Sequence, residues 1–356
     1  MNHDASPYAS NLFAGKYIIG SFKCSTQAGH VYDAFNITTR INVNMKFGHL
    51  LEPNNHEKEW RTLCALEKFR HDPQNEAIEN PLVNEVIYDV VCGKLYQAIV
   101  FPHSAVNLET LLAISKMEAT GKLPVDFAIR VFIQMLEGCA FLNKNLESVH
   151  GLIQPSSVEF CNLSVVPNPE GGRLPATPRI VLTDLCNVEK YGFRDKDLQA
   201  YSLNYKSTEA ALGLKLAKSS DVWACGCVLF EMIFGERLFN SSVPLDLLNT
   251  IEKMIGLIPQ RMKRNHMEAY GARNLRSMTD KHLSLKNVYD VSKIRSIENH
   301  FQLPEQKMLL RILRKTLQTD PYVRPEPSSM LALTVDERRK CKKEEDLAMN
   351  GNTSTQ

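Results

Sequence analysis

Residues 220–232 read SDVWACGCVLFEM, and this segment carries more information about the fold than any other in the sequence. It is an apolar, helix-like run of the kind found in helices buried inside a protein. Its two cysteines, Cys225 and Cys227, are expected to be small buried thiols, because they lack the CxxC spacing of metal or redox sites. Helical patterns extend from Ser219 to about residue 334, so we expect the run to belong to a large helical region.

Length and composition indicate a globular protein that is large enough for two lobes. The 356 residues are long for one core, and 44% hydrophobic with 23% charged residues is an ordinary balance. The net charge of +2 gives no reason to expect nucleic acid or a membrane surface as partner. Nine scattered cysteines without CxxC spacing indicate a reduced, intracellular protein. The N-terminus lacks the apolar core of a secretory signal.

The sequence changes near Pro102 from mainly strand patterns to mainly helical patterns, and this divides the chain into two parts. Strand patterns at 17–22, 31–35 and 42–47, and a hairpin turning at Cys92–Gly93, surround one helical segment at 57–69. Helices are expected at 106–117 and 125–146, short strands at 157–160 and 179–182, and an exposed loop at 161–178. We therefore predict an α+β protein with an N-terminal tail (1–15), a β-rich lobe (16–101), a helical lobe (102–335) and a charged, disordered tail (336–356).

Residues 149–160, VHGLIQPSSVEF, have the outline of a catalytic loop: a helix, then a histidine, then a proline five residues later. A catalytic loop should hold an acid, a base or a nucleophile. The position after His150-Gly151 carries Leu152, which can be none of these.

Eight stretches in order resemble the protein kinase family, over residues 16–335. The set is far more specific than any single member, and SDVWACGCVLFEM is its strongest part. The stretches are GHVYDAF (29–35), INVNMK (41–46), EKEWRTLCAL (57–66), VHGLIQPSSVEF (149–160), IVLTDLC (180–186), NYKSTEAALG (204–213), SSDVWACGCVLFEMIFGERLF (219–239) and DPYVRP (320–325). The resemblance implies a bilobal kinase fold.

Finer features resemble the LAMMER (Clk-like) kinases of the CMGC group. LLNTIEKMIGLIPQRM (247–262) is similar to the region that names that family, and the loop at 161–178 falls where the family has an insertion. A CMGC-type insert is expected at about 256–305. DYRK-type kinases are the nearest competitor.

The resemblance implies ATP and Mg²⁺ as cofactors and assigns the residues that would hold them. Lys46 stands where a lysine binds the phosphates, with Glu59 as its expected partner and Glu57 as the alternative. Asp184 stands at the metal-binding aspartate. Gly29 and Val31 complete the expected nucleotide-binding set.

Much of the expected chemistry is missing. The catalytic aspartate position is Leu152, the lysine position is Gln154, and the second metal ligand is Ser157, a weaker one. Other departures are Cys24 and Thr26 in place of two phosphate-loop glycines, Gly151 in place of an arginine and Cys186 in place of a glycine. No catalytic residue is intact, and we expect nucleotide binding to be weak or lost.

The expected adenine pocket is altered too. Its roof falls at Asn44 and its floor at Glu159, which we expect to be protonated, paired or turned outward, because an unpaired buried carboxylate is unfavourable. A shift of one residue would place Val158 or Phe160 at the floor instead.

The structural motifs are retained. Glu209 and Arg324 are placed to form a buried ion pair, Asp221 to hold the backbone of the catalytic loop, and His150 and Leu185 to stack in the core. The sequence keeps what the fold needs and loses what phosphoryl transfer needs.

We therefore expect a pseudokinase that acts by binding a protein, either an active kinase or its substrates. The alternatives are a Ser/Thr or dual-specificity kinase with residual activity, and an ATP-sensing module without turnover. The resemblance places the protein in the nucleus or the cytoplasm, and the basic stretch RRKCKK (338–343) is compatible with the nucleus.

Overall fold

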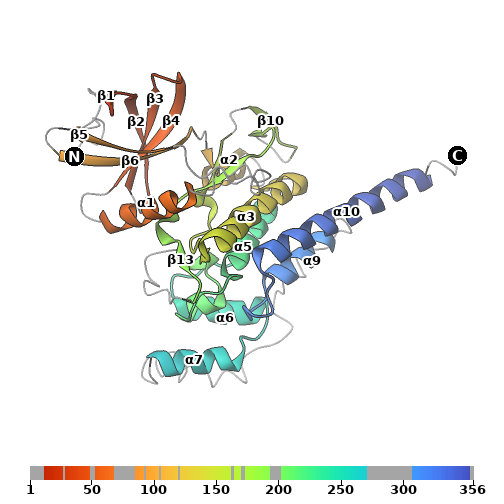
Figure 1. Ribbon diagram of the computed structural model, residues 1–356. Helices are drawn as coiled ribbons and strands as arrows, with labels where there is room; N and C mark the ends of the chain where they lie inside the picture. The colour runs from red at the N-terminus through yellow and green to blue at the C-terminus, as the bar shows by residue number, and fades with distance from the viewer. Residues whose placement is uncertain are drawn as a thin grey trace.

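The computed structural model describes residues 12–26, 29–48, 53–67, 85–91, 94–103, 106–118, 121–161, 164–169, 173–192, 202–270 and 307–352. They form two lobes, one built around a β-sheet and one built from helices, as Figure 1 shows.

The first lobe is an antiparallel sheet with the strand order β1-β2-β3-β4-β6-β5. Strands β2 to β6 coincide with the expected strand patterns, whereas β1 lies in the stretch 1–15 that is expected to be a tail. The turn at Cys92–Gly93 lies outside the described residues. The bounds are β1 (Leu12–Phe13), β2 (Tyr17–Ser25), β3 (Gly29–Asn36), β4 (Ile41–Gly48), β5 (Glu85–Val91) and β6 (Lys94–Pro102).

Alternation along the strands gives this sheet two different faces. Val43, Met45 and Phe47 of β4 belong to one apolar cluster. Lys46 lies on the opposite face, with its register partners Val31 and Ile99 on the neighbouring strands. Helix α1 (Pro53–Glu67) packs near this face and next to the 3₁₀ turn η3 (Leu185–Asn187) of the second lobe.

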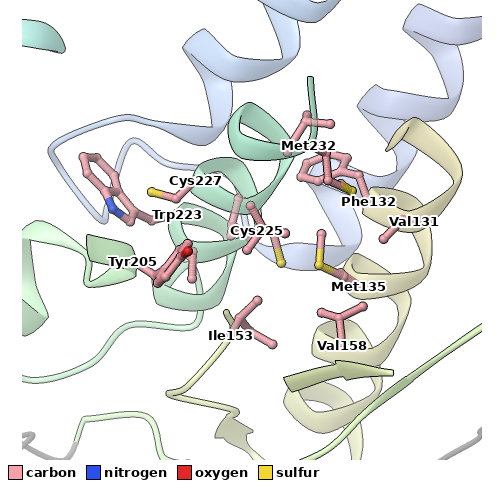
Figure 2. Packing of buried hydrophobic residues seen from close by; sticks show 14 of the residues in the cluster. Val131, Phe132, Met135, Ile153, Val158, Tyr205, Trp223, Cys225, Cys227 and Met232 are labelled. Atoms are coloured by element: carbon pink, nitrogen blue, oxygen red, sulfur yellow. The ribbon is translucent and has the colours of Figure 1, made fainter. Parts of the chain in front are cut away.

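The second lobe is organised around α3 (Val125–Leu146) and α5 (Ser220–Phe234). Thirteen of the 15 residues of α5 are buried, as expected of the apolar run at 220–232. Figure 2 shows Cys225 of α5 directed toward Met135 of α3, with Ile153 and Val158 lying beneath. The Sγ atoms of Cys139 and Cys225 lie 4.0 Å apart as free thiols.

The remaining helices, 3₁₀ turns and strands complete this lobe. They are β7 (Val106–Asn107), α2 (Leu108–Glu118), β8 (Ser148–Val149), η2 (Pro155–Ser157), β9 (Val158–Phe160), β12 (Ile180–Leu182), β13 (Glu189–Lys190), η4 (Leu203–Tyr205), α4 (Thr208–Ala211), α6 (Pro244–Met254), α7 (Gln260–Tyr270), α9 (Lys307–Thr316) and α10 (Pro327–Asn352).

Three further sequence expectations need correction. Val106–Asn107 is a strand paired with β9 rather than the start of a helix. The expected exposed loop at 161–178 contains a two-stranded hairpin, β10 (Val165–Pro167) with β11 (Arg173–Pro175). The expected disordered tail continues α10 as far as Asn352.

Two ion pairs join the start of that stretch to neighbouring helices. Arg338 pairs with Asp126 of α3, and Glu337 pairs with Arg311 of α9, so the charged stretch is held against the lobe. Beyond these contacts α10 projects away from the body of the protein (Figure 1). Of the expected insert at 256–305, only the part up to Tyr270 lies within the described residues. Within the described part of the chain, no helix has the length and apolarity to cross a membrane.

Candidate active site

Lys46, Glu59 and Asp184 meet between the lobes in a buried ionic network. The Lys46 ammonium donates to Glu59 Oε1 and Oε2 at 3.0 and 3.1 Å and to Asp184 Oδ1 at 3.2 Å. The Leu185 backbone N–H donates to Glu59 Oε1 at 3.2 Å. These contacts supply as many acceptors as the ammonium has protons, so the lysine is satisfied by the protein itself.

The choice between the two candidate glutamates is clear. Glu57 is exposed and pairs with Arg61 one turn along α1, at 2.6 Å. Glu59 lies on the helix face that carries the buried Leu63 and Leu66, which follow it by four and seven residues. Helical spacing therefore directs Glu59, and not Glu57, toward Lys46.

Lys46 is protonated in this setting. Burial by itself would lower its pKa, but the carboxylates of Glu59 and Asp184 outweigh burial and raise the pKa above its usual range. Asp184 itself adopts a left-handed backbone conformation, φ 64°, which aspartate tolerates better than most residues. The network is thus an ionised structural contact as well as a possible phosphate site.

The hairpin between β2 and β3 has lost two of three expected glycines. The Thr26 backbone N–H donates to the Gly29 carbonyl at 2.8 Å, and the Thr26 hydroxyl donates to the same oxygen at 3.2 Å. A Cβ at Gly29 would lie 1.9 Å from the carbonyl oxygen of Phe47 on β4, so this glycine is required by strand packing. Its retention is therefore no evidence for a phosphate ligand.

Cys24 is half-buried where the first of these glycines would lie. Burial raises the pKa of its thiol, and the nearby charge of Glu159 raises it further. The charges of Asp184 and Lys46 also act on it, which places Cys24 beside the ionic network and Glu159 together. A thiol in this environment stays protonated and is a poor nucleophile.

Asn44 and Glu159 lie where the expected adenine roof and floor fall. Asn44 is fully buried and shares the Lys46 face of β4, two residues away. On β9, the ring of Phe160 packs 5.8 Å from that of Phe127 on α3, so Phe160 and Val158 face the helical core. Glu159 faces the opposite way, which excludes the register shifted by one residue.

Glu159 does not turn outward. Its side chain belongs to a residue that is only 9% exposed, and Oε2 has no hydrogen-bond partner among the described residues. Phe101 was not among the residues expected at the site. It is paired with Asn44 in the sheet, and its ring centroid lies 5.9 Å from Lys46 Nζ. The alternation of β6 was the signal that could have placed Phe101 in the cleft.

The catalytic loop is held by Asp221 from α5. The backbone N–H groups of His150 and Gly151 donate to its two carboxylate oxygens at 2.7 and 2.9 Å. The His150 ring lies 3.0 Å from the Thr183 carbonyl through Nε2 and accepts from the Leu152 N–H through Nδ1 at 3.3 Å. Burial lowers the pKa of His150, in keeping with this neutral pattern.

Gly151 has a conformational reason to be glycine. Its φ is +76°, and a Cβ there would lie 2.9 Å from the carbonyl oxygen of Asn187. A long basic side chain at this position would strain the loop.

The loop presents no general base. Leu152 is buried, at 5% exposure, and the carboxylate of Asp221 is occupied by the loop backbone. Ser157 is also occupied: its hydroxyl lies 3.0 Å from the Leu152 carbonyl and 2.9 Å from that of Gln154, and it accepts from the Gln154 N–H at 3.1 Å. The expectation that Ser157 is a weak metal ligand does not fit this local role.

The remaining donors do not suit the Mg²⁺ pair expected from the resemblance. Mg²⁺ prefers several oxygen ligands in octahedral geometry. Asp184 is the one carboxylate left at the expected positions, and it is paired with Lys46. In the described part of the chain, no group of three or more His, Cys, Asp or Glu residues is arranged to hold a metal.

Glu209 and Arg324 form a buried ion pair, and Leu185 is buried in the same core as α3 and α5. The structure thus forms the expected Glu209–Arg324 pair and the expected contacts of Asp221 with the loop backbone. The stacking of His150 on Leu185 stays a prediction. The structure also brings Lys46, Glu59 and Asp184 together.

Comparison with known proteins supports the same fold. No protein-family model matches the chain. It is 27% identical over 190 residues to serine/threonine-protein kinase AFC2 of Arabidopsis thaliana, covering 49% of this chain and 44% of that protein. It is 24% identical over 231 residues to cyclin-dependent kinase-like 5 of Homo sapiens, covering 58% of this chain and 21% of that protein. Each match therefore spans less than half of the relative's length.

The crystal structure of a kinase domain matches with a TM-score of 0.71 and 18% identity, over 92% of this chain and 97% of that one. This agreement confirms the expected bilobal kinase fold.

Proposed function

We propose that this chain, a distant member of the protein kinase superfamily related to the CMGC kinases, is a pseudokinase that acts by binding another protein. Its expected partner is an active kinase or a substrate of one, in the nucleus or the cytoplasm. The LAMMER-like segment at 247–262 supports a position near the LAMMER (Clk-like) kinases within that group.

The observation that carries this proposal is the buried Leu152 in a loop that is otherwise well formed. Asp221 and His150 hold the loop in place through the backbone contacts described above. At the point where the acceptor hydroxyl would be oriented, the loop offers an apolar side chain. Phosphoryl transfer depends on positioning and electrostatics, so a loop without this carboxylate loses a factor of about 10²–10⁴ in rate from general-base catalysis alone.

A second candidate is an ATP-sensing module without turnover. The preformed contact of Lys46 with Glu59 and Asp184 favours it, because this network could hold phosphates without any catalytic base. The loss of two phosphate-loop glycines and the presence of Asn44 and Glu159 oppose it.

The test is phosphate transfer from radiolabelled ATP with Mg²⁺ to Arg/Ser-rich peptides and to the protein itself. The matched control is Lys46→Met, which removes the expected phosphate contact. We expect wild type and control to incorporate equally little label. Incorporation by the wild type that disappears in Lys46→Met would establish an active kinase and reject the proposal.

A further inference from the structure

Among the buried side chains between the lobes, carboxylates outnumber cations. Three carboxylates, those of Glu59, Asp184 and Glu159, lie there with one buried cation, Lys46. Lys46 is shared between Glu59 and Asp184 and donates to both. Glu159 is left outside this network, and its Oε2 accepts no hydrogen bond from a described residue. Lys23 and Arg179 lie near enough to act on the Cys24 and Cys161 thiols, as Glu159 does, but neither donates to Oε2.

Glu159 itself indicates that a ligand is needed. Its residue is nine-tenths buried, and Oε2 has no hydrogen-bond donor among the described residues. A buried, unsatisfied carboxylate oxygen is unfavourable, so a donor from outside the chain would be stabilising. Strand alternation on β9 directs the side chain away from the α3 core and toward the cleft, where its charge acts on Cys24.

The surroundings of Glu159 suit an organic cation better than a nucleotide. Val31, Ile99 and Phe101 line the Lys46 face of the sheet with apolar and aromatic surface. A carboxylate below this surface repels a polyanionic nucleotide, and one carboxylate provides too few oxygens for a divalent metal.

We propose that the cleft binds a guanidinium group, with Glu159 as its carboxylate partner. A guanidinium is planar and weakly hydrated, and its forked N–H groups match both oxygens of a carboxylate. The group could belong to a free small molecule or to an arginine side chain of a bound peptide. This guanidinium site deepens the proposed function, because it names a ligand group for the binding role. It rests on the proposed function only to that extent.

The test compares ligands that differ in charge alone. Binding of n-butylguanidine and of its neutral isostere n-butylurea is measured by protein NMR, with n-butylammonium as a third probe. We expect the wild type to bind the guanidine at least about tenfold more tightly than the urea or the ammonium. Equal affinity for guanidine and urea would overturn the proposal, and ammonium binding equal to guanidine binding would overturn its guanidinium specificity.

Variants assign the effect to one residue. Glu159→Gln is nearly isosteric and should abolish the preference for guanidine over urea, whereas Glu57→Gln, an exposed glutamate of α1, should retain it. If Glu159→Gln melts abnormally, Glu159→Asp keeps the charge and should retain part of the preference. A preference unchanged in a folded Glu159 variant would overturn the proposal.

Two blocked tripeptides, with a central arginine or a central citrulline, distinguish the sources. Preferential binding of the arginine peptide identifies a peptide ligand, and binding of butylguanidine alone identifies a free small molecule. Phosphate transfer by the wild type would reject the pseudokinase assignment without affecting these ratios. Failure of the two proposals is therefore distinguishable.

Discussion

Arg324 and Glu209 form a bidentate ion pair in which both side chains are almost completely buried, at 0% and 2% exposure. Nη1 donates to Oε1 at 2.7 Å and Nη2 donates to Oε2 at 3.1 Å. The Ser220 hydroxyl donates to the same carboxylate at 2.7 Å, and the guanidinium lies 5.1 Å from the Trp223 ring centroid. Burial would raise the pKa of Glu209, but the Arg324 charge outweighs it and the pKa is lowered. The pair joins α4 to the turn before α10.

Arg324→Ala should therefore lower the free energy of unfolding by about 3–5 kcal/mol, because it leaves the Glu209 carboxylate buried without its partner. This corresponds to a drop in Tm on the order of 10 °C, measured by circular dichroism. Arg311→Ala, which removes an exposed pairing with Glu337, is the matched control and should change Tm little. Equal effects of the two substitutions would contradict the structural role of the Arg324 pair.

Lys46→Met should lower the stability of the protein near neutral pH. The difference in stability between the variant and the wild type should become smaller as the pH falls. Burial first, and then the charge of Asp184, raise the pKa of Glu59, and Lys46 opposes them. Without the ammonium, the folded state holds a proton on Glu59 more tightly than the unfolded state does. The variant therefore gains stability as pH falls through the folded-state pKa of Glu59.

Thermal melts at about pH 7.5 and about pH 5.5 measure this change, with the wild type beside the variant. The double variant Lys46→Met/Glu59→Gln lacks the titrating carboxyl group. Its loss of stability relative to the wild type should therefore depend less on pH. The loss of stability in Lys46→Met could instead stay constant or grow toward acid pH. That result would show that the buried network is not ionised as described.

Nucleotide binding should be weak and should depend on Lys46 and Asp184, the groups that remain for the phosphates. With a Kd on the order of 1 mM, 1 mM ATP would stabilise the protein by about 0.4 kcal/mol, or about 1 °C in Tm. Thermal shift with and without Mg²⁺ measures this, and Asp184→Asn should abolish the Mg²⁺-dependent part. A shift of many degrees that survives Asp184→Asn would mean that ATP binds elsewhere.

Local periodicity explains what could be predicted of the site. Period-two alternation places Asn44 and Lys46 on one face of β4, and helical spacing directs Glu59 inward and Glu57 outward. The ordered motifs were sufficient for the fold, because each has a strong local pattern and their sequence order fixes the arrangement of the lobes.

The remaining features depend on contacts between distant segments, which periodicity does not encode. Lys46 is expected to bind phosphates, yet Asp184, 138 residues away along the chain, pairs with it. The hydroxyl of Ser157 bonds within its own loop, and Arg338 of α10 pairs with Asp126 of α3. The unpaired oxygen of Glu159 is a property of the packed cleft and of no single strand.

Two parts of the phosphoryl-transfer machinery are proposed to be lost: the base in the catalytic loop and the site for the phosphate donor. Leu152→Asp with Ser157→Asn repairs the loop alone. The repaired protein would still have Cys24 and Thr26 in place of glycines and a cleft bounded by Asn44 and Glu159. A restored base has nothing to act on unless ATP is held first. Adding Asn44→Ala and Glu159→Leu should restore nucleotide binding before any activity appears.

The most direct measurement is therefore phosphate transfer from radiolabelled ATP by the Leu152→Asp/Ser157→Asn variant, with the same protein carrying Lys46→Met as background. A normal circular dichroism spectrum and melt establish that the variant is folded. We expect incorporation no greater than the background. Robust incorporation that depends on Lys46 would contradict this expectation, because the natural cleft would then hold ATP well and the missing base would be the only defect.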